Sequence, residues 1–171
     1  MNLFLIGLPG SGKSTLGKEL AQMLGLALVD TDGEIISTEG RTIETIFKES
    51  GEVYFRKAEQ NLLHRLTEKN NQLISTGGGM PCFFDNIEVM NQKGIVVFID
   101  VPPATIHKRL IAQRSENRPM LENKTDEEVL LFLQQKYEER FPYYSKAAIH
   151  VKGSDIRSTE ILEELKKKGL H

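Results

Sequence analysis

The sequence predicts a three-layer α/β domain, in which helices cover both faces of a parallel β-sheet. Short apolar runs of strand length alternate along the chain with longer segments of helical period, a pattern typical of strands joined by crossover helices. The chain contains no internal repeat, no low-complexity tract and no change in composition that would mark a second domain. We therefore expect residues 1–171 to form a single domain.

The predicted strands are short and apolar. A strand that is buried on both faces of a parallel sheet has a continuous apolar run instead of an alternating pattern. Leu3–Ile6 fits this description, and Leu26–Val29 is expected to be a second buried strand, closed by Asp30. In chain order, the predicted strands are Leu3–Ile6, Leu26–Val29, Leu73–Ser75, Ile95–Ile99 and Ala148–Val151.

The predicted helices have apolar residues at helical spacing, and several have clear ends. Gly25 is placed to end the first helix, and Thr125 with Glu128 three residues later is a capping-box signature for a helix that runs towards Arg140. The predicted helices are Lys13–Leu24, helical segments in the thirties and forties, Glu52–Lys69, Ala104–Gln113, a helix from Thr125 towards Arg140, and a basic-ended helix from Ser158 to about Lys168.

The composition excludes several classes of function. With a net charge of −2, the chain has no overall positive field that would hold nucleic acid or an anionic membrane. One cysteine excludes an internal disulfide, and the four histidines lack metal-ligand spacing. No apolar run approaches the ~18 residues of a membrane span, and the N-terminus lacks the features of a secretory signal. We expect a soluble, cytoplasmic protein without a nucleic-acid or membrane partner.

The strongest motif is residues 7–15, GLPGSGKST, which match the phosphate-binding pattern G-x-x-x-x-G-K-[ST]. Its glycines let backbone N–H groups converge on a phosphate at the N-terminus of the following helix. Lys13 adds a positive charge for the β- and γ-phosphates, and the Ser14 hydroxyl can ligate Mg²⁺. Because the motif follows a buried strand and opens a helix, we predict that the chain binds ATP or GTP with Mg²⁺.

Two carboxylates follow the second predicted strand. The carboxyl ends of the strands face the ligand crevice of an α/β sheet, so Asp30 and Asp32 are placed at that crevice. If the chain stays extended, both side chains point roughly the same way, one towards the water shell of the metal and the other towards an acceptor hydroxyl. The alternative is an exposed polar turn that caps the next helix.

Four further segments carry candidate site residues. Arg56 and Glu59 share one helix face, and a surface ion pair is the alternative for them. The glycine triplet 77–79 at a strand end suggests a ligand close to the bare backbone, with a plain loop as the alternative. Arg118 lies in a polar segment suited to close over ATP. Arg140, at a helix end beside an aromatic turn, suits a carboxylate.

In this order, the motifs resemble those of shikimate kinases, and the match covers nearly the whole chain. The motifs are a GxPGSGKST loop, D-x-D, G-E-x-x-F-R-x-x-E, a glycine triplet, R-P-[LM]-L and a late R-x-x-x-Y. The resemblance implies a P-loop NTPase fold with a five-stranded parallel sheet, a lid at approximately 110–125 and substrate-binding helices at approximately 31–62. It also implies transfer of the γ-phosphate of ATP to the 3-hydroxyl of shikimate, with Mg²⁺, in aromatic amino acid biosynthesis.

The resemblance also assigns roles to single residues. Asp30 would assist Mg²⁺ through water, Asp32 would accept the proton of the attacking hydroxyl, and the Gly78 backbone would lie beside the shikimate ring. The implied catalytic residues are Lys13, Asp32 and Arg118; the ATP-binding residues are Gly10, Ser11, Gly12, Lys13, Ser14, Thr15, Arg118 and, on the adenine side, Arg157; the shikimate-binding residues are Asp32, Arg56, Gly78 and Arg140; the metal-binding residues are Ser14 and Asp30.

Several alternatives stay open at this point. The stretch before Arg118 aligns ambiguously, so Arg109 or Arg114 could supply a second cation. A gluconate kinase or a nucleotide kinase would share the fold, although a nucleotide acceptor would call for more cations. A P-loop regulatory module usually has a strand that ends in a metal-binding Asp, whereas the third strand here ends in Ser75 and Thr76. We expect a monomer, because no apolar surface stripe requires a partner.

Overall fold

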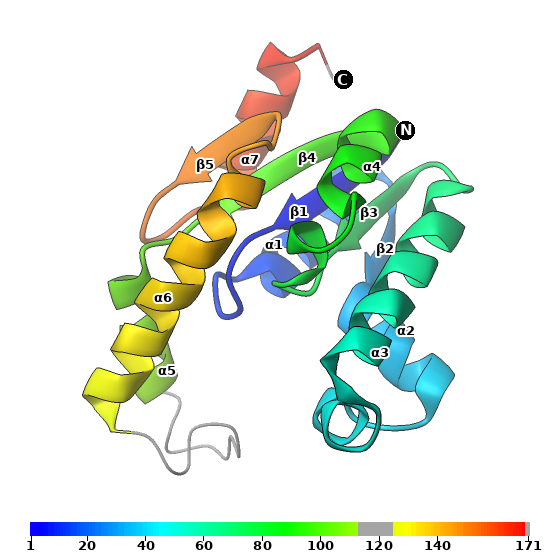
Figure 1. The fold of residues 1–171 in the computed structure, drawn as a ribbon. Coiled ribbons are helices and arrows are strands. Elements are labelled where there is room, and N and C mark those ends of the chain that lie inside the picture. The colour runs from blue at the N-terminus through cyan, green and yellow to red at the C-terminus, as the bar shows by residue number, and fades with distance from the viewer. Residues whose placement is uncertain (113–124, 170–171) are drawn as a thin grey trace.

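The computed structural model describes residues 1–112 and 125–169, and these form a five-stranded sheet between helices (Figure 1). The strands are β1 (Asn2–Ile6), β2 (Ala27–Asp30), β3 (Gln72–Ser75), β4 (Gly94–Asp100) and β5 (Ile149–Lys152). The helices are α1 (Lys13–Leu24), α2 (Thr31–Glu39), α3 (Ile43–Thr67), the 3₁₀ helix η1 (Met80–Cys82), α4 (Asn86–Lys93), α5 (Pro103–Ala112), α6 (Asp126–Tyr144) and α7 (Ser158–Lys167).

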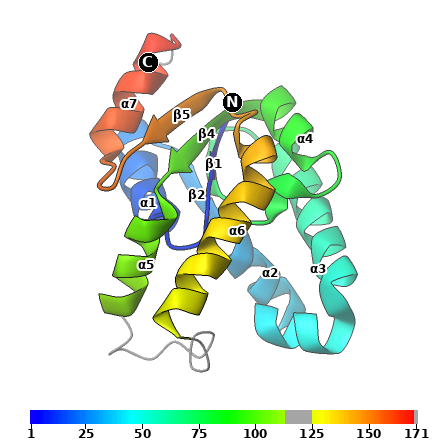
Figure 2. The ribbon, with the colours of Figure 1, turned by 60° about the vertical axis from the view of Figure 1, so that its left-hand side comes forward.

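The sheet is parallel throughout and has the order β2-β3-β1-β4-β5. Figure 2 shows α1 and α7 on one face of the sheet and α3, α4 and α6 on the other, which confirms the predicted three-layer α/β fold and its five strands. The central strands β1 and β4 supply much of the core: Phe4, Leu5, Ile6, Val96, Val97 and Ile99 are fully buried. Parallel pairing brings the carboxyl ends of all the strands to the same end of the sheet.

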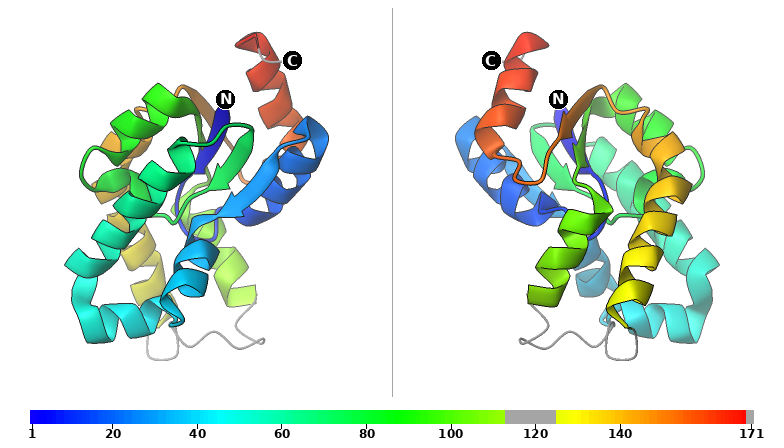
Figure 3. Two further views of the ribbon diagram at one scale, coloured as in Figure 1. Left: turned by 90° about the vertical axis from the view of Figure 1, so that its right-hand side faces the viewer. Right: turned by 90° about the vertical axis from the view of Figure 1, so that its left-hand side faces the viewer.

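The elements that build the site lie at this carboxyl end of the sheet. Figure 3 shows α2, the beginning of α3 and α5 projecting beyond the carboxyl ends of the strands. Within α3, Gly51 has non-helical dihedrals (φ 81°, ψ 168°) and divides the helix into two parts. Glycine adopts a positive φ without a steric penalty, which explains why the helical periodicity restarts near Glu52.

The second predicted strand is not buried, so this expectation was wrong. Leu28 is 43% exposed, and every residue of β2 is at least partly accessible. The physical reason is topological: β2 pairs only with β3 and forms an edge of the sheet. An apolar tetrapeptide does not reveal from its composition whether a second strand will cover it.

Two other expectations are refined by the structure. The sequence did not predict α4 or the short η1 that precedes it. The helix expected to end near Arg140 continues to Tyr144 and contains Pro142 in its last turn. Proline has no backbone N–H, so the carbonyl four residues before Pro142 loses its helical donor, and α6 ends two residues after Pro142. The predicted start of this helix is confirmed, since Thr125 and Glu128 form a capping box.

The remaining helix ends and lengths agree with physical expectation. Gly25 ends α1 in the left-handed conformation (φ 65°), and its N–H donates to the carbonyl of Ala21. Among the described residues, no helix combines the length and apolar character needed to cross a membrane.

Candidate active site

The loop between β1 and α1 has the conformation that a phosphate-binding loop requires. Gly10 and Gly12 have positive φ (81° and 93°), and α1 begins directly after Gly12. A Cβ atom at Gly10 would lie 2.9 Å from Ile106 Cγ2, so a side chain there would collide with α5. The Ser11 N–H donates to the Leu8 carbonyl (3.2 Å), so the N–H groups placed to face an anion are those that follow it at the N-terminus of α1.

Lys13 is buried at the centre of this loop. Its Nζ donates to the carbonyls of Gly7 (3.0 Å) and Leu8 (2.9 Å). Burial lowers the pKa of Lys13 to about 8, although the nearby carboxylate of Asp32 acts in the opposite direction. A cation held in a desolvated site gains strongly from an incoming anion, so the position suits polyphosphate binding.

A cavity of about 490 Å³ opens in front of the loop. It is bounded by the phosphate loop, the β2–α2 junction, the segment after β3 and one face of α5. Its lining residues are Pro9, Gly10, Gly12, Lys13, Ser14, Thr15, Asp30, Asp32, Ser75, Thr76, Gly77, Gly78, Arg109 and Leu110.

The predicted phosphate-binding residues Lys13 and Ser14 thus share one cavity with Asp30, Asp32 and Gly78.

The two carboxylates after β2 do not lie on an extended chain, as one expectation assumed, because α2 begins at Thr31. Asp30 is the N-cap of α2, and its Oδ1 accepts a hydrogen bond from the Gly33 N–H (3.0 Å). Its Oδ2 accepts a hydrogen bond from the Ser14 hydroxyl (3.3 Å). The capping alternative is therefore confirmed for Asp30, and the same side chain also contacts the phosphate loop, while its role at a metal ion stays a prediction.

Asp32 lies in the first turn of α2 and faces the glycine triplet. A Cβ on Gly77 would lie 2.5 Å from its Oδ1, and the Gly77 N–H donates to the Thr31 hydroxyl (2.9 Å). Burial raises the pKa of Asp32, and the neighbouring Asp30 raises it further, while Lys13 opposes the change. A carboxylate with a raised pKa is a stronger base than one in water.

The glycine triplet is packed against side chains of the site. A Cβ on Gly78 would lie 2.7 Å from Pro9 Cδ and 2.8 Å from Arg140 Nη1, and a Cβ on Gly79 would collide with the Arg56 guanidinium. A ligand contact at the triplet stays a prediction. The close approach that the glycines permit is made by the protein's own side chains, which the sequence pattern did not reveal.

Arg56 is buried, with 8% of its surface exposed, so the alternative of an ion pair on the surface is wrong. Its Nη1 donates to Glu59 Oε2 (2.7 Å), and its Nε and Nη2 donate to Glu52 Oε1 (3.2 and 3.0 Å). A guanidinium has five N–H donors. Two donors of Arg56 thus remain for a ligand, one on each terminal nitrogen.

Glu59 and Arg140 each have an unpartnered buried atom in the described structure. Burial raises the pKa of Glu59 to about 7 despite the opposing effect of Arg56. Its Oε1 and the Nη1 of Arg140 have no hydrogen-bond partner among the described residues. Buried polar atoms of native proteins are nearly always hydrogen-bonded, so both atoms are suited to contact a bound polar molecule or water.

The last turns of α6 fix Arg140 beside the triplet. The Tyr144 hydroxyl donates to the Gly78 carbonyl (2.6 Å), and Tyr144 is fully buried. Sequence reasoning gave Tyr144 no role, and it placed Glu59 beside Arg56 without assigning it a function. Their positions in R-x-x-x-Y and R-x-x-E are the signals that could have marked them.

A second cavity, of about 580 Å³, lies on the other side of the phosphate loop. Arg157 lines it, although its side chain is 74% exposed and forms an ion pair with Glu160 (3.0 Å). Arg109 lines both cavities, and its Nη2 donates to the Ser154 carbonyl (2.6 Å). Arg109 is therefore beside the phosphate loop, whereas Arg114 and the predicted lid residue Arg118 lie outside the described residues.

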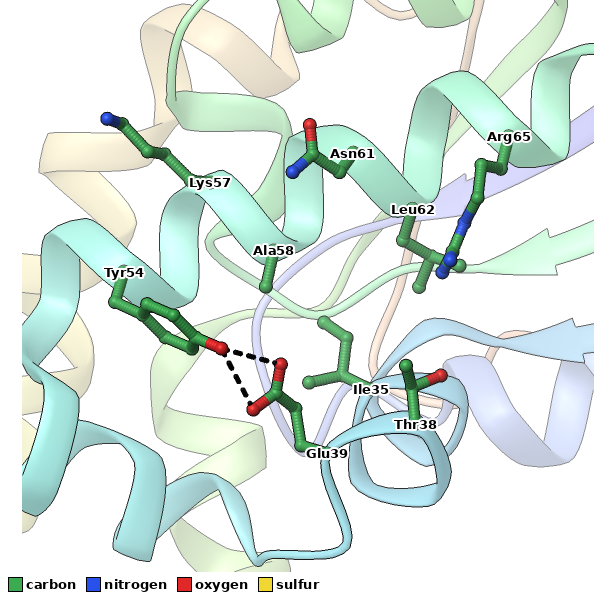
Figure 4. Close-up of a pocket in the computed structure, with 9 residues that line it drawn as sticks. All are labelled: Ile35, Thr38, Glu39, Tyr54, Lys57, Ala58, Asn61, Leu62 and Arg65. Carbon is green, nitrogen blue, oxygen red and sulfur yellow. Dashed lines mark hydrogen bonds between the residues drawn. The ribbon is translucent and has the colours of Figure 1, made fainter.

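A third cavity, of about 330 Å³, lies between α2 and α3, away from the phosphate loop. Figure 4 shows the Tyr54 hydroxyl directed at the Glu39 carboxylate, while Lys57 and Asn61 point away from both. The hydroxyl donates to the two carboxylate oxygens (3.0 and 3.1 Å). Tyr54 and Glu39 are the polar lining residues that pair with each other in the described structure, and none of the predicted site residues lines this cavity.

Comparisons with known proteins agree with this arrangement. A family model described as shikimate kinase matches residues 9–168. A shikimate kinase from Phocaeicola vulgatus is 43% identical over 154 residues, which cover 90% of this chain and 87% of that protein.

Solved structures give the same result. Shikimate kinase from Bacteroides thetaiotaomicron matches with a TM-score of 0.90 at 38% identity, covering 98% of each chain. Shikimate kinase from Acinetobacter baumannii, solved in complex with shikimate, matches with a TM-score of 0.86 at 32% identity, covering 99% of this chain and 95% of that one. A gluconokinase from Sinorhizobium meliloti has a TM-score of 0.57 at 15% identity, a likeness of fold alone. The chain belongs to the shikimate kinase family of ATP-dependent kinases.

Proposed function

We propose that the protein transfers the γ-phosphoryl group of ATP to the 3-hydroxyl of shikimate, which gives 3-phosphoshikimate and ADP. The reaction would take place in the cavity in front of the phosphate loop, called the cleft below. The observation that carries the proposal is the meeting of two unlike halves. Lys13 and the phosphate loop form one side of the cleft, and Asp32 with Gly78 forms the other. Arg56 and Arg140 pack against the same glycine triplet as Asp32. Two cations suited to bind a substrate carboxylate therefore lie close to a carboxylate suited to act as a base.

The phosphate half would hold ATP. Residues 10–15 offer backbone N–H groups at the N-terminus of α1, and Lys13 supplies the charge. Arg118, from the polar segment between α5 and α6, would close on the phosphates, and Arg157 would contact the adenine side. The second cavity, which Arg109 and Arg157 line together, supports this placement of the base.

The residues near Ser14 fit a magnesium ion. The Ser14 hydroxyl and the Asp30 carboxylate are oxygen ligands, and they lie 3.3 Å apart. The described residues hold no cluster of three or more acidic, cysteine or histidine ligands, and Mg²⁺ usually keeps several waters and takes substrate phosphates as ligands. Ser14 would bind the ion directly and Asp30 through water. The bound ion would neutralise charge on the β- and γ-phosphates.

The acceptor half would bind shikimate through its carboxylate. The two remaining donors of Arg56 and the unpartnered Nη1 of Arg140 are charged hydrogen-bond donors for the two carboxylate oxygens. The Gly78 backbone would lie against the ring. Asp32 would then accept the hydroxyl proton as the oxygen attacks the γ-phosphorus, and its raised pKa supports that role. ATP as the phosphate donor also supports a cytoplasmic location, and a monomer stays a prediction.

The test measures ADP release from ATP and Mg²⁺ with shikimate, with gluconate and without an acceptor, in the wild type and in Asp32→Asn. We expect turnover with shikimate alone, and a fall in kcat of about 100-fold or more in the variant with unchanged ATP affinity. Glu163→Gln, the same carboxylate-to-amide change at an exposed position of α7 outside the cleft, is the matched control. Turnover with gluconate, or an Asp32→Asn enzyme as fast as the control, would contradict the proposal.

A further inference from the structure

A strained residue follows the glycine triplet at a short distance. Phe84 has φ 53°, and it shares a positive φ only with Asn71 among the non-glycine residues that the structure describes. Asparagine tolerates this conformation, whereas a bulky aromatic side chain rarely adopts it. The Phe84 ring is itself 52% exposed, so its own packing offers little compensation. Strain of this kind persists where the surrounding structure requires it, often at a functional site.

The neighbouring ring gives a reason for the strain. Phe83 places its ring against the Arg56 guanidinium, with the Arg56 Cζ 4.1 Å from the ring centroid. Two other rings near the same group, Phe55 (5.2 Å) and Phe47 (5.7 Å), are more distant and belong to α3 itself. Phe83 is therefore the ring in closest contact with Arg56, and it comes from a different part of the chain.

The segment that carries Phe83 is fixed at both ends. Gly79, at its start, packs so closely on Arg56 that a Cβ would collide with the guanidinium. At its other end, the Asn86 side chain donates to the Met80 carbonyl (2.8 Å), and Asn86 is fully buried. Residues 79–86 thus wrap around the guanidinium, and the turn at Phe84 is part of the path that returns the chain to α4.

We propose that Phe83 is a positioning residue for the shikimate carboxylate. Glu52 and Glu59 hold Arg56 by hydrogen bonds to its nitrogen atoms, but such bonds leave the guanidinium plane able to tilt. A ring stacked on the plane fixes its orientation. The two donors left on Arg56 then point in one direction before the substrate arrives. This inference rests on the proposed contact between Arg56 and the substrate.

Two substitutions of Phe83 separate the effect of its aromatic face on Arg56 from the effect of filling space. Phe83→Leu keeps an apolar side chain of similar reach but removes the aromatic face. We expect it to raise the KM for shikimate about tenfold, the effect of losing a partly desolvated cation–π contact, while kcat and the KM for ATP stay within about twofold of wild type. Phe83→Tyr keeps the ring and should restore the wild-type KM.

The controls separate this inference from the proposed function. Tyr54→Leu removes a ring near another arginine, Arg41 (5.9 Å), outside the cleft, and should leave the KM for shikimate unchanged. Arg56→Ala tests the contact that the inference assumes. If Arg56→Ala raises the KM and Phe83→Leu does not, or if leucine serves as well as tyrosine, the role of Phe83 is refuted and the proposed function stands. If Arg56→Ala leaves the KM unchanged, the proposed contact between Arg56 and the carboxylate and the role of Phe83 are both refuted, whereas the phosphoryl transfer is tested separately by ADP release with shikimate.

Discussion

Two arginines on neighbouring elements have almost the same partners and different surroundings. Arg41 lies between Glu39 (2.7 Å) and Glu49 (3.1 Å), with a tyrosine ring close by. Arg56 lies between Glu59 (2.7 Å) and Glu52 (3.0 Å), with a phenylalanine ring close by. The ion-pair distances are nearly the same in the two clusters, but the burial of the arginine differs. The Arg41 side chain is 29% exposed and the Arg56 side chain 10%.

The pKa of the closer glutamate shifts in opposite directions in the two clusters. Hydrogen bonds from Arg41 and Tyr54 lower the pKa of Glu39, as expected for an exposed ion pair. Burial raises the pKa of Glu59 although Arg56 donates to it at the same distance. In the buried cluster desolvation outweighs the ion pair, so its charges are costly without a ligand to compensate them. The same contacts thus form a partly exposed ion-pair cluster at Arg41 and, as we propose, a substrate-binding site at Arg56.

The largest expected effect is that of Arg56→Ala on shikimate turnover. The substitution removes two donors for the carboxylate and leaves Glu59 buried without its charged partner. We expect kcat/KM for shikimate to fall by about 100-fold or more, since removing one partner of a buried charged contact to a ligand costs about 2–5 kcal/mol of binding free energy. The measurement is steady-state kinetics with each substrate varied. A loss no greater than that of Arg41→Ala would contradict the distinction between the clusters.

A smaller effect is expected from Glu59→Gln, measured as stability against pH. The pKa of Glu59 is about 7 in the folded protein and 4.5 ordinarily, so the native state binds this proton more tightly than the unfolded state. Its contribution is complete below pH 4.5 and is lost as the pH rises to about 7. We expect urea unfolding to show the wild type losing on the order of 1–3 kcal/mol relative to Glu59→Gln over this range. Parallel pH profiles for the two proteins would contradict burial as the cause.

The smallest effect is expected from Arg41→Ala. Exposed ion pairs are well solvated and contribute little, so we expect the thermal midpoint to change by no more than about 2 °C. The KM values for ATP and shikimate should equal those of the wild type. Thermal unfolding and the kinetic assay used for Arg56→Ala measure both quantities. A rise in the KM for shikimate would show that the outer cluster also shapes the cleft.

Much of the fold was predictable because its signals are local. The phosphate-loop glycines, the capping box at Thr125 and the glycine at position 25 each act through neighbouring residues, and each is confirmed. The strand β2 was predicted, but its burial was not, because an edge position depends on which strands are formed elsewhere. The helix α4 was missed altogether. All five strands were predicted from their own apolar runs, and the family resemblance added that they form one five-stranded parallel sheet.

The sequence by itself determined the nucleotide loop, the α/β class and the family, since these follow from residue types at fixed spacing. The tertiary structure alone decided which of two similar arginine clusters is buried, why three consecutive glycines are needed, and that Phe83 meets Arg56 across 27 residues of chain. The physical reason is that desolvation depends on everything that surrounds a group. Spacing along a helix reports which side chains are neighbours, but not how much water the rest of the chain removes.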